Sequence, residues 1–446
     1  MAGIAQLARE NGHVVRGCDS NVYPPMSTLL EQLDIPVLQD YRASHLDDEY
    51  DQVIIGNALS RGNPIVETVL NRRLPYQSGP QWLHDNILQQ RKVIAVAGTH
   101  GKTTTSAMIA WILGCDGKDP GFLIGGKPGN SDRSAKAASG DWFVIEADEY
   151  DTAFFDKRSK FVHYCPSVAV LNNLEFDHAD IFDNLEQIKR QFHHLVRIVP
   201  GAGTLVVNAD DPELESVLEM GCWSNTCNVS INSPENSWYA KATIADASAF
   251  DVFHHGVLSG TVNWQCIGQH NMFNGLAAVA AAHCAGVSIA DVCQALQTFI
   301  AADRRLQLLF QGGGTTLYED FAHHPTAIRL TLQAVRAKHP ESSLIAVVEP
   351  RSNTMKSGIH GTTLGRSLDQ ADSTFIYSPG GLDWDPGSLE TTSPLEVCDS
   401  VDSLMELLKL RIEANSVIIC MSNGSFDGIP GLLGEHLQKM FVEIKS

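Results

Sequence analysis

A phosphate-binding loop is the first place where the sequence predicts chemistry. The apolar run 93–97 leads into Gly98-Thr99-His100-Gly101-Lys102-Thr103-Thr104, and a helical pattern of apolar residues follows. The glycines would let backbone N–H groups approach phosphate oxygens, and the helix N-terminus would add its positive dipole end. Lys102 could reach the β- and γ-phosphates, and the Thr103 hydroxyl could bind Mg²⁺. Although Val96 stands where a standard loop has its first glycine, the strand–loop–helix setting predicts a nucleotide site.

Two later strands end in side chains that could complete this site. The apolar run 142–145 leads into Glu146-Ala147-Asp148-Glu149, and the run 168–171 leads into a polar cluster that contains His178. Carboxylates opposite a phosphate loop suit a Mg²⁺-nucleotide site, although acids at a strand end can also cap a helix. A lone histidine is usually structural, but this one lies among carboxylates. Because α/β sites form at the carboxyl ends of strands, we expect the loop, Glu146 and His178 at one edge of a sheet.

Three further polar positions have two interpretations each. Asp19 ends the strand 13–19, where dinucleotide-binding folds place an acid against a ribose hydroxyl, but a solvated turn acid is an equal alternative. Asn271 and Asn274 share one helical face and could bind a ligand or merely cap the helix.

The elements alternate between β and α throughout, which predicts an α/β protein of three domains. Short βα units up to Gln90 suggest a small parallel sheet, although the strand and glycine loop expected before the first helix, 3–11, are missing. Either Met1 is an internal start or the N-terminus has been trimmed. A step around Asp303-Arg304-Arg305-Leu306 predicts a second junction. We therefore expect domains at 1–90, 91–302 and 303–446, the last built on strands 317–320, 344–348 and 417–421.

Composition excludes several other classes of protein. The chain has 446 residues and a formal net charge of −20, which argues against nucleic-acid and anionic-membrane partners. Its apolar runs are shorter than the roughly 18 residues that a membrane span needs, and the start lacks a secretory pattern. Ten cysteines without a C-x-x-C pair are typical of reduced thiols. These features predict a cytoplasmic protein.

Taken together, the motifs resemble those of the Mur ligase family, in order and along the whole chain. Two stretches, 154–164 and 349–356, look like the murein peptide ligase branch of that family. The motifs that carry the resemblance are Gly98–Thr104, Glu146–Glu149, Asn173–His178, His270–Asn274, Arg304-Arg305 and Phe321–Pro325.

The resemblance implies a fold, a reaction and two cofactors. The fold would have an N-terminal Rossmann-like UDP-binding domain, a central P-loop ATPase domain and a C-terminal Rossmann-like domain. The reaction would join the tripeptide L-Ala-γ-D-Glu-meso-diaminopimelate to UDP-N-acetylmuramate through an acyl phosphate, in peptidoglycan recycling. The cofactors would be ATP and two Mg²⁺ ions, and the enzyme would be a monomer or weak dimer.

Roles of individual residues are also implied by the resemblance. Lys102 and the rest of the loop would hold ATP, Thr103 and Glu146 would bind the first Mg²⁺, and His178 the second. Asn271, Asn274, Arg305 and Asp320 would contact the nucleoside. His324, Arg351, Asn353 and Lys356 would face the incoming peptide, Asp19 would face the sugar nucleotide, and His178 or His324 would serve as general base. Several relatives bridge the metals with a carbamylated lysine, for which residues 191–194 offer no equivalent.

Other functions remain open at this point. The alternative within the family is the ligase that adds L-alanine to UDP-N-acetylmuramate, which would share the metals and the nucleotide. Folate or polyamino-acid ligases share the central domain, but the stretch 349–356 speaks against them. A non-catalytic nucleotide switch is a different class, which the complete loop with Glu146 and His178 argues against.

Overall fold

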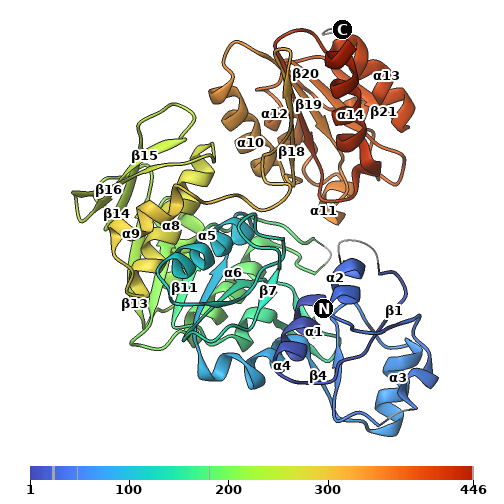
Figure 1. The fold of residues 1–446 in the computed structure, drawn as a ribbon, viewed down its shortest axis with the longest axis vertical. Coiled ribbons are helices and arrows are strands. Elements are labelled where there is room, and N and C mark those ends of the chain that lie inside the picture. The colour runs from blue at the N-terminus through green and yellow to red at the C-terminus, as the bar shows by residue number, and fades with distance from the viewer. Residues whose placement is uncertain (23–25, 48, 180, 444–446) are drawn as a thin grey trace.

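The molecule consists of three lobes arranged along its long axis (Figure 1). This computed structural model describes residues 1–22, 26–47, 49–179 and 181–443. The first lobe, blue in Figure 1, contacts the central lobe, and the C-terminal lobe, orange to red, lies at the other end. Across the described chain, no helix combines the length and the apolar character that a membrane crossing requires.

The first lobe contains two separate pairs of short parallel strands. β1 pairs with β2 and β3 pairs with β4, each strand being three residues long. The single small sheet expected from the sequence is therefore wrong, because within the described residues no ladder joins β1 to β3. The elements are α1 (Ala2–Glu10), β1 (Gly17–Asp19), α2 (Met26–Gln32), β2 (Val37–Gln39), η1 (Ala43–Leu46), β3 (Val53–Ile55), α3 (Pro64–Arg72), β4 (Tyr76–Ser78), α4 (Gly79–Asn86) and η2 (Leu88–Gln90).

The central lobe is built on a ten-stranded sheet in the order β16-β15-β14-β13-β12-β11-β5-β8-β6-β7. Its strands are β5 (Lys92–Ala97), β6 (Gly121–Leu123), β7 (Ala135–Lys136), β8 (Trp142–Ala147), β11 (Val168–Leu171), β12 (Thr204–Asn208), β13 (Asn225–Ser230), β14 (Trp238–Ala242), β15 (Ala249–His254) and β16 (Val257–Asn263). Its helices are α5 (Lys102–Cys115), η3 (Lys160–His163), α6 (Leu185–Ile198), α7 (Pro212–Glu219), α8 (Gln269–Cys284) and α9 (Ile289–Leu296), and a hairpin joins β9 (Asp151–Ala153) to β10 (Asp156–Ser159).

Both faces of this sheet are buried, which explains why its central strands are almost wholly apolar. Along β5, Ile94 and Val96 pack into a core with α5, α8 and α9, whereas Val93, Ala95 and Ala97 pack into a core with α6 and α7. Successive side chains of a strand point to opposite faces, so burial on both sides requires an uninterrupted apolar run.

The C-terminal lobe is a six-stranded sheet in the order β17-β18-β22-β19-β20-β21, parallel except for the β17–β18 pair. The three strands expected from the sequence, β18, β22 and β19, are neighbours in it. The elements are β17 (Gln307–Gly312), β18 (Thr315–Asp320), α10 (Pro325–Lys338), β19 (Ser343–Val348), α11 (Asn353–Lys356), α12 (Gly361–Ser367), β20 (Ser373–Tyr377), η4 (Pro386–Ser388), β21 (Leu395–Cys398), α13 (Val401–Arg411), β22 (Ser416–Met421), η5 (Phe426–Gly428) and α14 (Ile429–Glu443).

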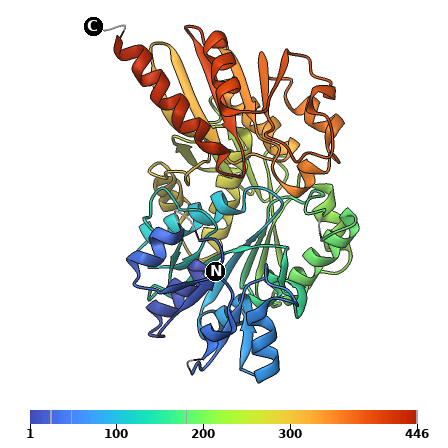
Figure 2. The same cartoon turned by 90° about the vertical axis from the view of Figure 1, so that its right-hand side faces the viewer.

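The first and central lobes share apolar cores in both directions. Leu7 of α1 and Trp82 and Leu83 of α4 belong to the same core as the strands of the central sheet. In return, Phe154 at the tip of the β9–β10 hairpin packs against the small core of the first lobe. Figure 2 shows the first lobe, in blue, lying against the lower part of the central lobe.

Candidate active site

The three strands that carry the motifs lie side by side in the central sheet. β5 pairs in parallel with β11 on one side and with β8 on the other, and Ala97 is opposite Leu171 and Ala147. The segments that follow these strands therefore leave the sheet at one edge, as expected from the sequence.

The loop after β5 depends on two glycines. Gly101 has φ +81°, and a Cβ there would lie 2.5 Å from Asn274 Oδ1. Gly98 has φ +151°, and a Cβ there would lie 2.9 Å from Asn172 Cβ. Any larger residue at either position would both strain the backbone and clash. Gly101 directly precedes α5, so the first N–H groups of that helix face the space where an anion could bind.

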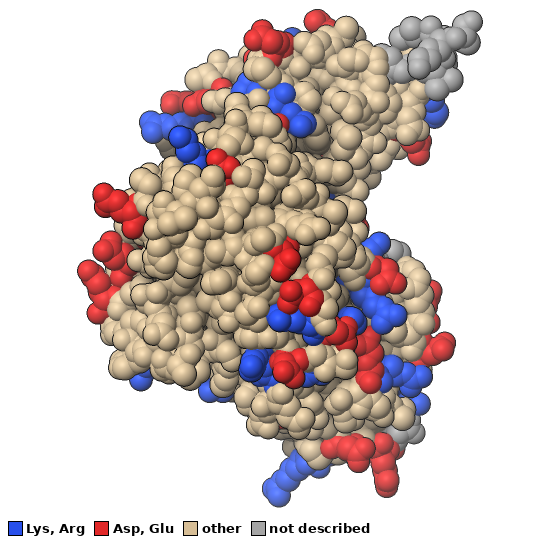
Figure 3. Space-filling model, turned by 60° about the vertical axis from the view of Figure 1, so that its left-hand side comes forward, with Lys and Arg blue, Asp and Glu red and all other residues tan. Residues whose placement is uncertain are grey.

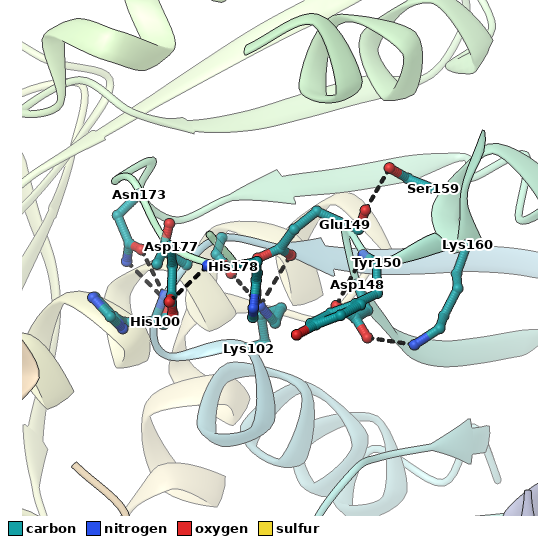
Figure 4. Close-up of polar contacts among 12 residues, drawn as sticks. His100, Lys102, Asp148, Glu149, Tyr150, Ser159, Lys160, Asn173, Asp177 and His178 are labelled. Carbon is teal, nitrogen blue, oxygen red and sulfur yellow. Dashed lines mark hydrogen bonds and ion pairs between the residues drawn. The ribbon is translucent and has the colours of Figure 1, made fainter. Parts of the chain in front are cut away.

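Lys102 lies between the loop and an acidic segment (Figure 4). Its Nζ donates to the Gly98 carbonyl at 2.6 Å and lies 3.1 Å from Glu149 Oε2. Burial lowers the pKa of Lys102, but the charges of Glu149 and Asp148 outweigh it and raise that pKa above its usual value. Lys102 is therefore a buried cation at neutral pH.

Glu149 joins Lys102 to His178. Its side chain is 2% exposed, and its Oε1 lies 3.1 Å from His178 Nε2. Burial raises the pKa of Glu149, but the charge of Lys102 and the hydrogen bond with His178 lower it below its usual value. For His178, burial lowers the pKa, and the hydrogen bond with Glu149 more than reverses this.

Glu146 lies beside Thr103 on the other side of the loop. Its Oε1 accepts from Gly125 N at 2.6 Å, and its side chain contacts the Thr103 hydroxyl, which in turn lies 3.4 Å from Arg305 Nη2. Burial raises the pKa of Glu146 despite these contacts. A buried carboxylate in this state gains from a nearby cation, which fits the expected metal role.

The donor set at this edge suits a hard divalent cation. Asp148, Glu149 and His178 offer ligand atoms that all lie within 4.8 Å of one another. Burial raises the pKa of Asp148, but the charges of Lys160 and Lys102 lower it to about 2, so it is ionised at neutral pH. Carboxylate oxygens next to a phosphate site are the ligands that Mg²⁺ uses with substrate phosphates.

A cluster of Glu175, His100 and His324 joins the central and C-terminal lobes. Glu175 Oε2 lies 3.3 Å from both His100 Nε2 and His324 Nδ1. Burial and the charge of His100 lower the pKa of His324, so its imidazole is neutral at neutral pH. A neutral imidazole is a competent proton acceptor, but His324 is buried here as the N-cap of α10.

Two cavities open at this edge. The larger has a volume of about 1370 Å³ and is lined by residues of all three lobes. The smaller, about 270 Å³, lies under α11 and shares Tyr150, Asp177 and His178 with the larger. Figure 3 shows the molecule hollowed between the C-terminal lobe at the top and the first lobe at lower right, where acidic and basic side chains are interspersed.

Most of the residues singled out in the sequence line these cavities. In the larger cavity are Thr99, His100, Gly101, Lys102, Thr103, Thr104, Glu146, His178, Asn271, Asn274, Arg305 and Asp320, and in the smaller are Arg351 and Asn353. Four of the predicted residues line neither cavity: Asp19, Gly98, His324 and Lys356. Asp19 instead accepts from Asn21 N at 3.0 Å, as the turn interpretation expects.

Asp320 supports the segment that links the central and C-terminal lobes. Its carboxylate accepts from Leu306 N at 2.7 Å and from Ala322 N at 2.8 Å. Arg304 and Leu306, with φ +60° and +49°, give this linker a sharp local bend. The same residue thus borders the cavity and holds the junction.

Sequence reasoning missed the central position of Glu149 and the contacts of Glu175. Both residues belong to the motifs Glu146–Glu149 and Asn173–His178. Only the turn after β8, however, shows that Glu149 is the acid that faces Lys102. Glu175 and His324 are far apart in the sequence, so no local pattern could reveal their contact.

Comparisons with family models cover nearly the whole chain. Residues 1–91 match the model described as Mur ligase family, catalytic domain, and residues 96–282 match the Mur ligase middle domain. Residues 304–424 match the model described as Mur ligase, glutamate ligase domain.

Individual relatives are similar over the same length. The UDP-N-acetylmuramate–L-alanyl-γ-D-glutamyl-meso-2,6-diaminoheptandioate ligase of Escherichia coli is 52% identical over 442 residues, which is 98% of this chain and 96% of the relative. The UDP-N-acetylmuramate–L-alanine ligase of Syntrophomonas wolfei is 31% identical over 386 residues, 85% of this chain and 81% of that protein.

A solved structure agrees with these matches. The crystal structure of a murein peptide ligase from Psychrobacter arcticus is 42% identical and superposes with a TM-score of 0.74 over 97% of this chain and 95% of its own. With the shared fold, the full-length identity and the conserved order of the three family models, the chain belongs to the Mur ligase family.

Proposed function

We propose that this protein is an ATP-dependent ligase that joins L-Ala-γ-D-Glu-meso-diaminopimelate to UDP-N-acetylmuramate, in peptidoglycan recycling. The observation that carries the proposal is the Lys102–Glu149–His178 chain at the edge of a cavity that all three lobes line. The 52% identity to the Escherichia coli enzyme supports the choice of substrates. We place the functional domains at 1–90, 91–302 and 303–446 and expect a cytoplasmic monomer or weak dimer.

The reaction requires activation of a carboxylate that is a poor acylating agent. The muramate carboxylate oxygen attacks the γ-phosphorus of ATP, and ADP leaves, which creates an acyl phosphate. Lys102 and the N-terminus of α5 are placed to hold the phosphate oxygens during this transfer. Thr103 and Glu146, and Asp148, Glu149 and His178, are the groups that would hold two Mg²⁺ ions, which neutralise developing negative charge when bound.

The second step forms the amide bond. The peptide amine attacks the acyl carbon, loses a proton and displaces phosphate. A neutral amine is required, so a base within reach would accelerate this step. Of the two candidates, His178 lines both cavities, including the smaller one, where Arg351 and Asn353 would face the peptide, and His324 lines neither. Because a metal-bound imidazole nitrogen cannot accept a proton, His178 could act as the base only where Asp148 and Glu149 alone hold the second Mg²⁺.

Water must be excluded while the acyl phosphate exists. The C-terminal lobe already contacts the central lobe through His324 to Glu175 and through Thr354 Oγ1, which donates to Asp177 Oδ1 at 2.9 Å. We expect this lobe to close further over bound substrates by rotation within residues 301–305.

The test is phosphate release from ATP in the presence of UDP-N-acetylmuramate, with the tripeptide or L-alanine as the amine. Turnover with the tripeptide and little with L-alanine supports the proposal, and preference for L-alanine moves the protein to de novo synthesis. If the rate of phosphate release depends neither on UDP-N-acetylmuramate nor on either amine, the protein is not a ligase of these substrates. Lys102→Ala should abolish turnover while circular dichroism stays unchanged.

The L-alanine ligase is the second candidate, since the Syntrophomonas wolfei enzyme with that name is 31% identical. Its reaction would use the same nucleotide and metal residues, so only the amine distinguishes the two.

A further inference from the structure

The β9–β10 hairpin holds a lysine beside the acidic segment of the site. Lys160 begins η3 directly after the hairpin, and its Nζ lies 2.6 Å from Asp148 Oδ2 and 5.5 Å from the centre of the Tyr150 ring. Figure 4 shows Lys160 at one end of the row of polar side chains, with Lys102 nearer its middle. Burial raises the pKa of Asp148, but the charges of both lysines outweigh this and lower it.

The backbone at Lys160 is held firmly in place. The preceding Ser159 is buried, and its Oγ donates to the Glu149 carbonyl at 2.6 Å. Lys160 N donates to the Tyr150 carbonyl at 3.0 Å. These bonds tie the lysine to the same segment that presents Asp148 and Glu149.

The hairpin also anchors Lys160 against the first lobe. Phe154 packs on the core formed there by Leu46, Ile55 and Val66, and the Phe155 ring lies 5.0 Å from that of Tyr76. Lys160 lines the larger cavity together with first-lobe residues Ile55, Gly56, Asn57, Gly79 and Pro80. Lys160 is thus a cation of the central lobe in a cavity that the first lobe also lines.

The chemistry of this position favours an anionic ligand. An ammonium group has three donors, and the contact with Asp148 engages one of them. The Lys160 side chain is 23% exposed, toward a cavity that Lys102 and the phosphate loop also line. An acceptor that reaches from the first lobe to the phosphate loop would lie in the same cavity as Lys160.

We propose that Lys160 binds anionic oxygens of the acceptor sugar nucleotide and so orients its carboxylate toward Lys102. The inference rests on the proposed function and names a residue of the same site. The anionic oxygens belong either to the diphosphate or to the muramate carboxylate, and the experiment separates these two sources.

The experiment compares Lys160→Met with Lys157→Met in the full-length protein. Lys157 is the matched control because it lies on the same hairpin, pairs with Asp151 at 2.7 Å and is 71% exposed. Calorimetric titration without ATP measures the affinity for UDP-N-acetylmuramate and for UDP, and steady-state kinetics measure KM for each substrate.

We expect Lys160→Met to weaken UDP-N-acetylmuramate binding roughly 10- to 100-fold, as for the loss of one charge-assisted hydrogen bond. Its KM for ATP should change less than about threefold, Lys157→Met should match the wild type, and Lys160→Arg should recover most of the affinity. An equal loss for UDP identifies the diphosphate, whereas a loss confined to UDP-N-acetylmuramate identifies the carboxylate.

Unchanged affinity in Lys160→Met, or an equal loss of affinity for every substrate, would overturn the role of Lys160. Turnover of the wild-type protein, measured in the same experiment, distinguishes a failure of the Lys160 role from a failure of the proposed function. A wild type that uses UDP-N-acetylmuramate while Lys160→Met binds it normally contradicts only the inference. A wild type that does not use it contradicts the function itself.

Discussion

Replacing Glu149 by glutamine should reveal how strongly the buried cation of Lys102 depends on its partner. The two groups approach to 3.1 Å, and their side chains are 16% and 2% exposed. At that distance and an effective dielectric constant of about 20, the attraction is on the order of 5 kcal/mol. Removing one partner of a buried pair costs about 3–5 kcal/mol, because the other charge stays buried.

Thermal unfolding of the nucleotide-free, metal-free protein measures this cost. For a unit of about 200 residues, 1 kcal/mol corresponds to roughly 2–4 °C, so Glu149→Gln should lower the melting temperature by on the order of 10 °C. The double variant Lys102→Met/Glu149→Gln removes both charges, and most of the loss should be regained. The single variant Lys102→Met is measured as well. If the loss in melting temperature of the double variant equals the sum of the losses of Glu149→Gln and Lys102→Met, the pair does not act as a unit and the reasoning fails.

Three further changes test other parts of the site. Gly101→Ala places a Cβ 2.5 Å from Asn274 Oδ1 at φ +81°, so strain of about 1–3 kcal/mol should weaken binding of an ATP analogue about 10- to 100-fold by calorimetry; unchanged affinity contradicts this. Burial raises the pKa of Glu175, but its histidine partners lower it to about 2, below the roughly 4.3 of an unfolded chain. Its ionised form therefore stabilises the fold above about pH 4, and this stability is lost as the pH falls toward 2. Plotted against pH, the melting temperature of Glu175→Gln should fall less steeply than that of the wild type over that range, and parallel curves refute it. Thr354→Val removes the donor to Asp177, which should cost about 1–3 kcal/mol in thermal unfolding, whereas an unaltered melting temperature would show that the contact contributes nothing.

The sequence was sufficient for the parts of the site that strand order controls. The phosphate loop and His178 follow apolar strands, and Glu146 is the penultimate residue of another, β8. Parallel strands with buried faces bring their carboxyl ends to one edge. The glycine requirement at Gly101 was also visible, although its steric cause, Asn274 of a distant helix, was not.

The remaining features depend on contacts between segments that the sequence separates widely. The Glu175 contact with His324 crosses between two lobes, and no periodicity predicts it. The single sheet expected in the first lobe failed because three-residue strands carry too little pattern to define which neighbour they pair with. Asp19 illustrates the same limit, since a strand-end acid and a turn acid look identical in a sequence.

The exchange of apolar contacts between the first and central lobes has a mechanical consequence. Leu7 and Trp82 belong to the core of the central sheet, and Gln6 Nε2 donates to the Ala135 carbonyl at 2.7 Å, while Phe154 packs against the core of the first lobe. Each of these two lobes thus packs side chains of the other, so we expect the first and central lobes to move as one rigid body. The C-terminal lobe, by contrast, contributes no described residue to the apolar cores of this body, and it meets the body through polar contacts such as those of Thr354 and His324 and through α10 beside the start of α8. The cavity wall that we assign to the sugar nucleotide therefore belongs to this rigid body. We expect the C-terminal lobe, which would bring the peptide, to move relative to it.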